Sequence, residues 1–153
     1  MFRAKGKDIG TRRAKDSAKT LLPLVRTLGE TGLRLSDALS LLMEDDKRVS
    51  VKAKDGRIRS VAIPEDLAKA FKGARWPFSG LKARAVQAAV RRLTLKLVGG
   101  GKIRYPYSPH DYRHRFAANL YRQTRDVFAV QKALGRASLA VTQVYLAGLG
   151  ALE

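Results

Sequence analysis

The sequence predicts an α+β domain that is mainly helical, with its helices packed around a small antiparallel sheet. Two observations lead to this class. Apolar residues recur at helical spacing in several separate segments, whereas they alternate with polar residues in only one segment, RVSVKAKDGRIRSVAIP. The chain has 153 residues, enough to bury one hydrophobic core. We therefore expect one domain over residues 16–153, preceded by a polar, basic and flexible arm or linker remnant at residues 1–15.

Two helices are expected before the sheet. The first should cover about residues 18–28, where four apolar residues repeat at helical spacing: Leu21, Leu22, Val25 and Leu28. Gly29 and Gly32 then interrupt the pattern. A second helix should begin near Ser36, which is a favourable N-cap residue. It should bury three apolar residues: Leu39, Leu42 and Met43.

The alternating segment predicts a two-stranded antiparallel ribbon that ends at Pro64. Its turn is Asp55-Gly56, which is among the strongest short-range signals for a hairpin. Because side chains alternate across a strand, Lys52 and Lys54 share one face. Lys54 lies beside the tip of the ribbon, so we expect its side chain to project beyond the sheet and reach a ligand.

Five further helices are expected after the ribbon. Their predicted positions are residues 67–72, residues 81–98, a helix from Ser108-Pro109, a helix between Asp126 and Gly135, and a last helix that is capped by Ser138 and carries Tyr145. In the helix at 81–98, one apolar stripe should face the core: Val86, Val90, Leu93 and Leu97. In the next helix, three residues are expected to be structural: His114, Phe116 and Ala117.

The charge balance indicates a polyanionic partner. The chain has 31 Lys and Arg against 13 Asp and Glu, a formal net charge of +18, and no acidic residue lies between Asp66 and Asp111. A solvated basic face and a membrane-binding surface are the alternatives. A membrane-binding helix would carry exposed Trp, Phe or Leu beside its charges, a face that the pattern does not present. Nucleic acid is therefore the favoured partner.

Composition also limits the location and the chemistry. The sequence has no apolar stretch of 18 residues and no signal-peptide core, so we expect no membrane partner and a cytoplasmic location, associated with the nucleoid of a bacterium or encoded by a phage. The chain has no cysteine, which excludes disulfides, thiolate metal ligands and thiol nucleophiles. Any nucleophile must be an oxygen or a nitrogen.

Four separated stretches carry candidate chemistry: TGLRLSD (31–37), KAKDGRIR (52–59), HDYRHRFA (110–117) and LGRASLAVTQVYL (134–146). Their order and spacing resemble the tyrosine site-specific recombinases of the phage integrase type. In that family an Arg lies in a T-G-L-R-x-S-E stretch and a Lys on a β-hairpin. H-x-x-R follows, and then L-G-H about ten residues before the nucleophilic Tyr. The resemblance extends from about Ala18 to Ala147, over the catalytic domain of the family.

The resemblance implies six catalytic residues: Arg34, Lys54, His110, Arg113, Arg136 and Tyr145. Tyr145 would be the nucleophile and would form a covalent 3′-phosphotyrosyl link to DNA, with no metal ion or other cofactor. Asp37 stands where the family usually has Glu, a mild change. The larger departure is Arg136, at a position where the family usually has His or Trp.

Elementary chemistry agrees with these roles. Attack on a phosphodiester adds negative charge to the non-bridging oxygens, and without a metal the protein must supply fixed cations there, for which forked guanidinium groups are suited. The unperturbed pKa of tyrosine is about 10, so the phenol must either lose its proton during attack or be acidified by the surrounding cations. His110 is the expected partner for that proton. Lys54 is expected to protonate the departing 5′-oxygen as a general acid.

Double-stranded DNA is the expected partner, and by resemblance a homotetramer is the expected assembly on it. The helix at 81–98 is a candidate for insertion into the major groove, with Arg84 the best candidate for reading a base. The expected DNA-binding residues are Lys52, Lys82, Arg84, Gln87, Arg91 and Arg92.

Two alternatives from other classes stay open. The first is a DNA-binding module that keeps the fold but has impaired catalysis, which Arg136 motivates. The second is a type IB topoisomerase-like enzyme, which would use similar chemistry to relax DNA. The acidic residues 44–46 are read as a solvated helix end and not as a metal site, because no second carboxylate cluster completes a two-metal centre.

Overall fold

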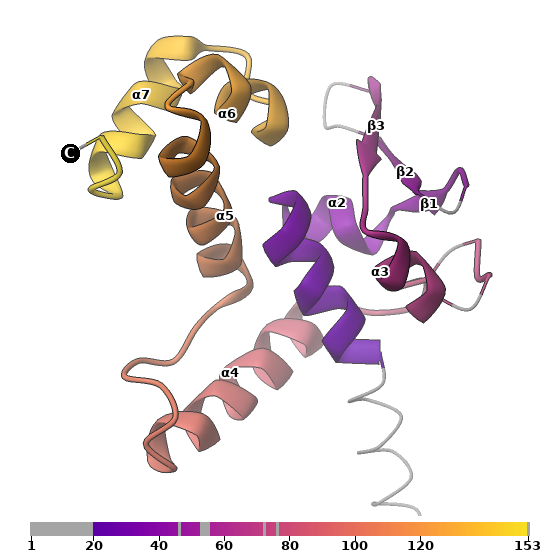
Figure 1. The fold of residues 1–153 in the computed structure, drawn as a ribbon. Helices are drawn as coiled ribbons and strands as arrows, with labels where there is room; N and C mark the ends of the chain where they lie inside the picture. The colour runs from indigo at the N-terminus through magenta and orange to yellow at the C-terminus, as the bar shows by residue number, and fades with distance from the viewer. Residues whose placement is uncertain (1–19, 46, 53–55, 72, 76, 153) are drawn as a thin grey trace, which may run out of the picture.

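A computed structural model describes residues 20–45, 47–52, 56–71, 73–75 and 77–152 (Figure 1). In chain order, a helix at residues 20–31 is followed by α2 (Leu35–Leu39), β1 (Leu42–Met43), β2 (Arg48–Lys52), β3 (Ile58–Ala62), α3 (Glu65–Ala70), α4 (Ala83–Gly99), α5 (Pro109–Thr124), α6 (Val127–Leu134) and α7 (Leu139–Gly148). The predicted class, mainly helical with a small antiparallel sheet, is confirmed. The arm predicted at residues 1–15 lies outside the described residues.

The sheet has three strands in the order β1-β2-β3, and both pairings are antiparallel. In the central pair, Val49 lies opposite Val61 and Lys52 opposite Ile58. Val49 and Val51 are buried, while Lys52 is exposed at the end of β2. The predicted ribbon is therefore present as β2 and β3, with one further strand beside it.

The further strand corrects the prediction for the second helix. Leu42 and Met43 do not lie in a helix but form β1, paired with β2. The helix begins at Leu35, one residue before Ser36, and ends at Leu39. At its end, the Ser40 hydroxyl lies 3.2 Å from the carbonyl oxygens of both Ser36 and Asp37, a local hydrogen bond of the kind that competes with helix continuation.

The core-facing stripe of α4 also differs from the prediction. Val86 and Val90 are buried as expected, but Leu93 and Leu97 are 48% and 37% exposed. Thr94 is buried instead, because its hydroxyl is satisfied by the carbonyl oxygens of Val90 and, across the following loop, Tyr107. A polar residue therefore occupies the position at which hydrophobic spacing predicted a leucine.

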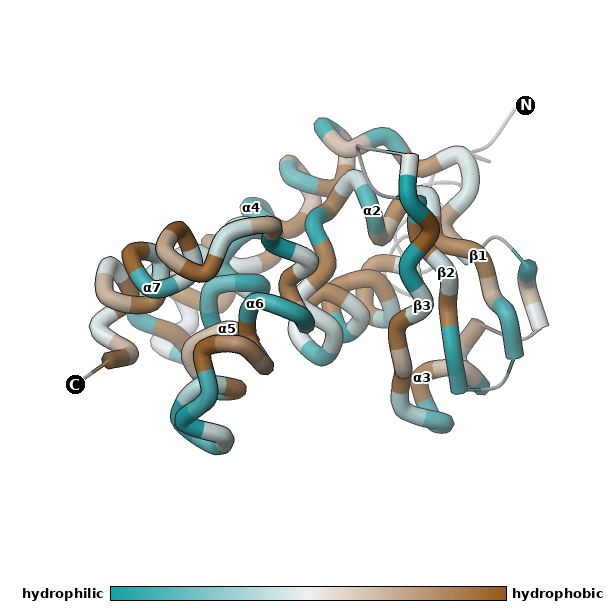
Figure 2. The backbone as a smooth tube through the Cα atoms, turned by 90° about the horizontal axis from the view of Figure 1, so that it is seen from above, coloured by the Kyte–Doolittle hydropathy of each residue, from teal (hydrophilic) through white to brown (hydrophobic). Residues whose placement is uncertain are grey.

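The core consists of two clusters. The N-terminal cluster joins the helix at 20–31 to α2, β2, α3 and α4, and includes Leu24, Leu28, Leu33, Val51, Leu67 and Val90. The C-terminal cluster joins α5, α6 and α7, and consists of Ala117, Ala118, Val130, Leu134, Leu146 and Ala151. Figures 1 and 2 show α5, α6 and α7 on one side of the molecule and the sheet with α3 on the other.

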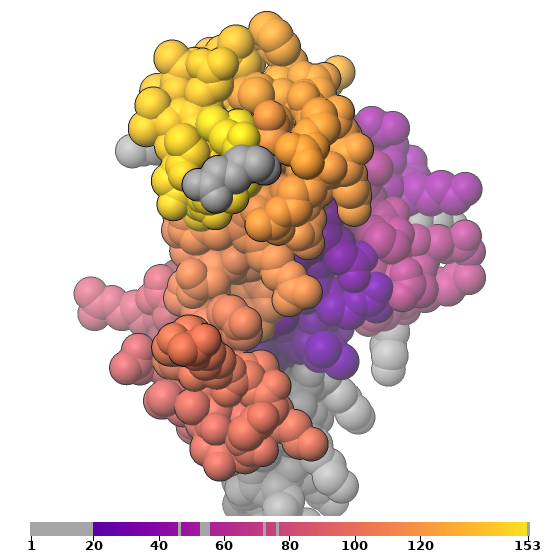
Figure 3. All heavy atoms as spheres, turned by 60° about the vertical axis from the view of Figure 1, so that its left-hand side comes forward, coloured from indigo at the N-terminus to yellow at the C-terminus, as the bar shows by residue number. Residues whose placement is uncertain are grey.

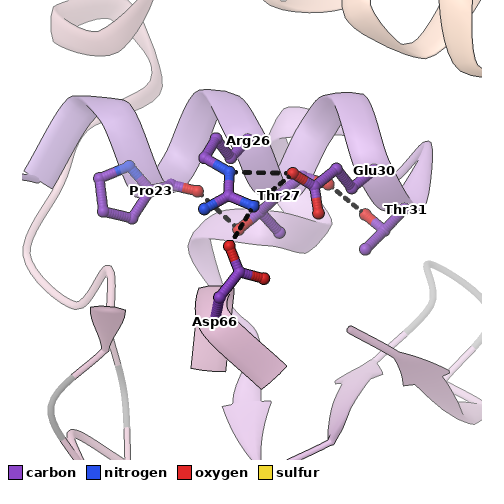
Figure 4. Close-up of polar contacts among 6 residues, drawn as sticks. All are labelled: Pro23, Arg26, Thr27, Glu30, Thr31 and Asp66. Atoms are coloured by element: carbon purple, nitrogen blue, oxygen red, sulfur yellow. Dashed lines mark hydrogen bonds and ion pairs between the residues drawn. The ribbon is translucent and has the colours of Figure 1, made fainter. Parts of the chain in front are cut away.

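Polar contacts reinforce the N-terminal cluster at its surface. The guanidinium of Arg26 binds Glu30 one turn later in the same helix and Asp66 at the start of α3 (Figure 4). Thr27 and Thr31 are buried, and each donates its hydroxyl to the carbonyl four residues earlier. The helix at 20–31 is thus fixed to α3 before Gly32, which has a φ of +64°, turns the chain towards α2.

The helix predicted at residues 67–72 is present as α3, but it begins two residues earlier, at Glu65, directly after Pro64. Pro64 takes the N-cap position, and Leu67, expected at the first turn, is buried in the middle of it. Within the described residues, no helix is long and apolar enough to cross a membrane.

Candidate active site

The start of α5 fixes the H-x-x-R stretch. Ser108 and Asp111 form a capping box: the Asp111 carboxylate accepts from the backbone N–H of Ser108 at 2.6 Å, and Pro109 occupies the first helical position. This cap sets the direction of the first turn. It presents the side chains of His110 and Arg113 towards the junction between the two clusters.

Arg113 connects the two clusters through their backbones. Its side chain is only 1% exposed. One end of the guanidinium donates to the carbonyl of Gly32 at the end of the first helix, and the other to the carbonyl of Leu134 in α6 at 2.9 Å. In Figure 3 the orange and yellow surface of α5 to α7 meets the purple surface of the N-terminal segments. We call this boundary between the two clusters the seam. Arg113 therefore links the two clusters from the interior of the protein.

The charge around Arg113 is unbalanced. Burial, together with the positive charges of Arg34, Arg136 and Arg59, lowers the pKa of Arg113 to about 10. The opposing influence is Tyr145, and no carboxylate contributes. Four guanidinium groups thus lie near one another, and among the described residues Asp37 is the acid that acts on one of them, Arg59; the excess of positive charge favours binding of an anion.

Arg34 is the exposed member of this group. It occupies the N-cap position of α2 in an extended conformation. Three neighbouring hollows share it: one is lined also by Gln87, Arg91 and His110, the second by Arg59 and Arg136, and the third by Lys52 and Asp37. Arg34 therefore lies where the start of α5, the end of α6 and the end of β2 meet.

Tyr145 is packed among the same cations. The ring of His114 stacks on the Tyr145 ring with 5.3 Å between centroids, and the guanidinium carbon of Arg136 lies 4.0 Å from the Tyr145 centroid. The phenolic oxygen is buried and makes no hydrogen bond to any described residue. Burial raises the pKa of the phenol, and the charges of Arg113 and Arg136 oppose that rise. The phenolic oxygen of Tyr145 is therefore enclosed beside the Arg136 guanidinium, while the residue as a whole is half-buried.

His110 completes the series. Its ring lies edge-on to His114 with centroids 4.3 Å apart. Partial burial lowers the pKa of His110 below its ordinary value of 6.5, and the neighbouring His114 and Arg113 lower it further. His110 is therefore neutral at pH 7, as an acceptor of the tyrosine proton needs to be.

The structure brings together five of the six residues predicted to be catalytic: Arg34, His110, Arg113, Arg136 and Tyr145. Lys54, the sixth, lies outside the described residues. The residues predicted to bind DNA are all exposed: Lys52, Lys82, Arg84, Gln87, Arg91 and Arg92. Gln87 and Arg91 line the hollow shared with His110, so α4 borders the site.

Two residues near the site were not predicted to belong to it. His114 was expected to be only structural, but it lies between His110 and Tyr145, and its buried Nδ1 has no hydrogen-bond partner among the described residues. Arg59 lies in the KAKDGRIR stretch, but no role was predicted for it. Strand alternation places Arg59 on a face of β3, but no sequence signal shows that it reaches α6.

No group of three His, Cys, Asp or Glu side chains lies close enough to hold a metal ion in the part of the chain that the structure describes. The polar groups that converge here are several guanidinium groups, two imidazoles and a phenol, with the carboxylates of Asp37 and Asp111 at the edges of the hollows.

Comparison with known proteins identifies the family. Residues 10–149 match the model of the phage integrase family. The chain belongs to the phage integrase family. Among curated members, it is 31% identical to the tyrosine recombinase XerD of Caulobacter vibrioides, over 86% of this chain and 51% of that protein. It is 33% identical to the tyrosine recombinase XerC of Xylella fastidiosa (strain M23), over 80% of this chain and 46% of that protein.

Solved structures of integrase-family proteins share the fold. The XerH site-specific recombinase bound to its difH substrate superposes with a TM-score of 0.66 at 24% identity, over 84% of this chain and 43% of that one. The catalytic domain of bacteriophage HP1 integrase gives a TM-score of 0.62 at 20% identity, over 88% of this chain and 84% of that one. The chain spans about half the length of the curated relatives it matches.

Proposed function

We propose that this chain carries the catalytic site of a site-specific DNA recombinase, which cuts and rejoins double-stranded DNA through a covalent 3′-phosphotyrosyl intermediate at Tyr145. The observation that carries the proposal is the convergence of Arg34, Arg113 and Arg136 beside a phenol, where among the described residues no carboxylate is one of the groups that shift the pKa of Arg113. A phosphodiester would supply the missing negative charge.

We propose the following roles for these groups. The phenolic oxygen of Tyr145 attacks the phosphorus, the bond to the 5′-oxygen of the next nucleotide breaks, and the guanidinium groups stabilise the charge that develops on the non-bridging oxygens. His110 takes up the phenolic proton. Lys54 gives a proton to the departing 5′-oxygen, a role proposed from the family resemblance alone.

Tyr145 must change its surroundings before it reacts, because its phenolic oxygen is buried. The guanidinium of Arg136 lies on the ring face and is itself a phosphate-binding candidate. A bound phosphate would compete for that guanidinium and loosen the cover over the ring. We therefore propose that Tyr145 becomes accessible when Arg136 turns from the ring to the DNA.

The DNA would lie across α4 and the hollows around Arg34. The six predicted DNA-binding residues supply this surface, with α4 proposed for the major groove. Each phosphate contact would lower the logarithm of affinity by about 0.9 for each unit of log salt. A cytoplasmic location follows from this function in bacteria, with association to the nucleoid through DNA itself. A tetramer stays a prediction.

Trapping the covalent intermediate tests the proposal. The chain is incubated at low salt with a pool of duplexes of randomised sequence, each nicked so that the short 5′-hydroxyl fragment diffuses away after cleavage. We expect DNA–protein adducts that survive denaturation in detergent, and none with Tyr145→Phe. Sequencing the trapped DNA gives a selected site for later assays. Tyr121→Phe, on α5, is the matched control and should form adducts normally. Adducts with Tyr145→Phe, or none with the unaltered chain, would contradict the proposal.

A further inference from the structure

Arg59 crosses from the sheet to the end of α6. It lies in β3 opposite Val51, and its side chain is half-buried. Its Nη1 donates to the carbonyl of Ala133 at 3.1 Å, a bond between residues 74 positions apart in the sequence. Like Arg113, it therefore joins the N-terminal cluster to the C-terminal cluster.

The guanidinium of Arg59 rests on Gly135. This glycine ends α6 with a φ of +62°, in the left-handed region. A Cβ at this position would lie 2.9 Å from the guanidinium carbon of Arg59 and closer still to its Nη1. Any side chain at Gly135 would thus displace Arg59, so the close approach needs glycine for space as well as for conformation.

Two arginines hold consecutive carbonyls in this turn. Arg59 binds the carbonyl of Ala133 and Arg113 binds that of Leu134. The backbone N–H of Arg136 then donates back to Gln131 at 3.0 Å, which closes the turn. The direction in which the Arg136 side chain leaves the backbone is therefore set by a turn that is held from both clusters.

We propose that Arg59 is a positioning residue for Arg136: its bond to Ala133 and its packing on Gly135 fix the turn from which Arg136 reaches the phosphate. The inference rests on the proposed function, since it assumes that Arg136 binds the cleaved phosphate. Arg34, Asp37, Arg59 and Arg136 line one hollow. Burial lowers the pKa of Arg59, and the negative charge of Asp37 opposes that lowering. Asp37 is therefore a nearby counter-charge for the Arg59 guanidinium.

A double-mutant cycle tests the inference on the selected DNA site. Arg59→Ala should slow adduct formation about 10- to 30-fold, within the range of one misplaced electrostatic group, and change the DNA Kd by less than about 3-fold. In an Arg136→Ala background the same substitution should have less than about a 2-fold effect, because Arg59 acts through Arg136. Arg59→Lys keeps one donor for Ala133 and should recover part of the rate.

Arg48→Ala is the matched control. Arg48 is a cation on the neighbouring strand that bonds Ser60 within the sheet and does not contact α6 through any bond recorded in the described residues. Its loss removes the same charge from the sheet, and should leave adduct formation within about 2-fold of the unaltered chain. An equal loss of rate with Arg48→Ala would mean that net charge, and not positioning, explains the effect.

Amide hydrogen exchange gives a readout that does not depend on cleavage. In Arg59→Ala, exchange at the Arg136 amide should be about 10-fold faster, while amides of β2 and α4 exchange as before. Unchanged exchange at Arg136, or a full additive effect of Arg59→Ala in the Arg136→Ala background, would overturn the inference. Failure of the unaltered chain to form any adduct would instead overturn the proposed function, and the exchange result would still decide whether Arg59 fixes the turn.

Discussion

The two sides of the seam contribute to the site in different ways. The N-terminal side offers Arg34, which is exposed and makes no side-chain hydrogen bond to another described residue. The C-terminal side offers Arg113, which is buried, and Tyr145, which is half-buried with its phenolic oxygen enclosed. One side thus presents a cation that is ready for a ligand, while the other buries a charge that lacks a balancing acid. Neither side is therefore a site alone.

The burial of Arg113 has a physical cost that the fold must offset. Removing a guanidinium from water is unfavourable, as the lowered pKa of Arg113 reflects. Two backbone carbonyls from opposite clusters recover part of that cost. A bound phosphate would recover more, so we expect DNA to tighten the seam as well as to occupy the site.

We expect the greatest loss from Arg113→Ala, which removes both a link between the two clusters and a cation of the proposed site. Two buried carbonyls lose a charged donor and a cavity forms, so the free energy of unfolding should fall by about 3 kcal/mol, despite the relief of a desolvated charge. Adduct formation should fall by at least about 10³-fold. Urea unfolding and single-turnover cleavage measure the two losses. Arg115→Ala, exposed on the same helix, is the control and should change stability by less than about 0.5 kcal/mol.

Arg34→Ala should separate the effect on stability from the effect on cleavage. Because Arg34 is exposed, its loss should leave the free energy of unfolding within about 0.5 kcal/mol of the unaltered value. The same loss should reduce adduct formation by about 10²- to 10³-fold, since a cation is removed from the phosphate. The same two assays apply. A stability loss as large as that of Arg113→Ala would remove the distinction between the two sides.

The pH dependence of cleavage sharpens the role of the C-terminal side. The pKa of His110 is lowered, so this imidazole stays neutral until the pH falls below 6.5 and then takes up a proton. Once protonated it no longer accepts the phenolic proton, and kcat/KM for cleavage, which reports the free enzyme, should fall on the acid side with a midpoint below 6.5. His110→Ala should be slower and lose this acid limb. An acid limb that persists unchanged in the variant would assign it to another group.

The smallest effect is expected for Asp66→Asn, which lies within the N-terminal cluster and away from the seam. The bond from Arg26 lowers the pKa of Asp66. Its stabilisation is therefore present at neutral pH, above the ordinary value of 3.8, and is lost as the pH falls through the lowered pKa. The variant should unfold at slightly lower urea concentration at neutral pH, and the difference should shrink on acidification. Its cleavage rate should equal that of the unaltered chain.

Local features of the fold were predictable from sequence. The caps at Ser108 and Ser138 and the glycine at 135 act within a few residues, and the structure has helices at the positions they predicted. β1 was missed because Leu42 and Met43 satisfy helical spacing as well as strand pairing, and only contact with β2 decides between them. The buried Thr94 was missed because its hydroxyl partner, the carbonyl of Tyr107, lies beyond the next loop.

The site, like the fold, was predictable from the sequence only in part. Motif spacing selected Arg34, Arg113 and Arg136, and the structure places their charges within reach of one another. It did not select Arg59, whose partner lies 74 residues away, or the position of His114 against Tyr145. Long-range contacts of this kind depend on how the two clusters meet, which no local pattern in the sequence records.

In the proposed site, cations from both sides of the seam act on one phosphate, and a neutral linkage tests this directly. In a methylphosphonate one non-bridging oxygen is replaced by a methyl group, so less negative charge needs to be stabilised. Placed at the cleaved linkage of the selected site, it should reduce the rate loss in both Arg34→Ala and Arg113→Ala by at least about 10-fold, and one linkage away it should rescue neither. Rescue of the two variants at different linkages would show that the two sides do not share a phosphate.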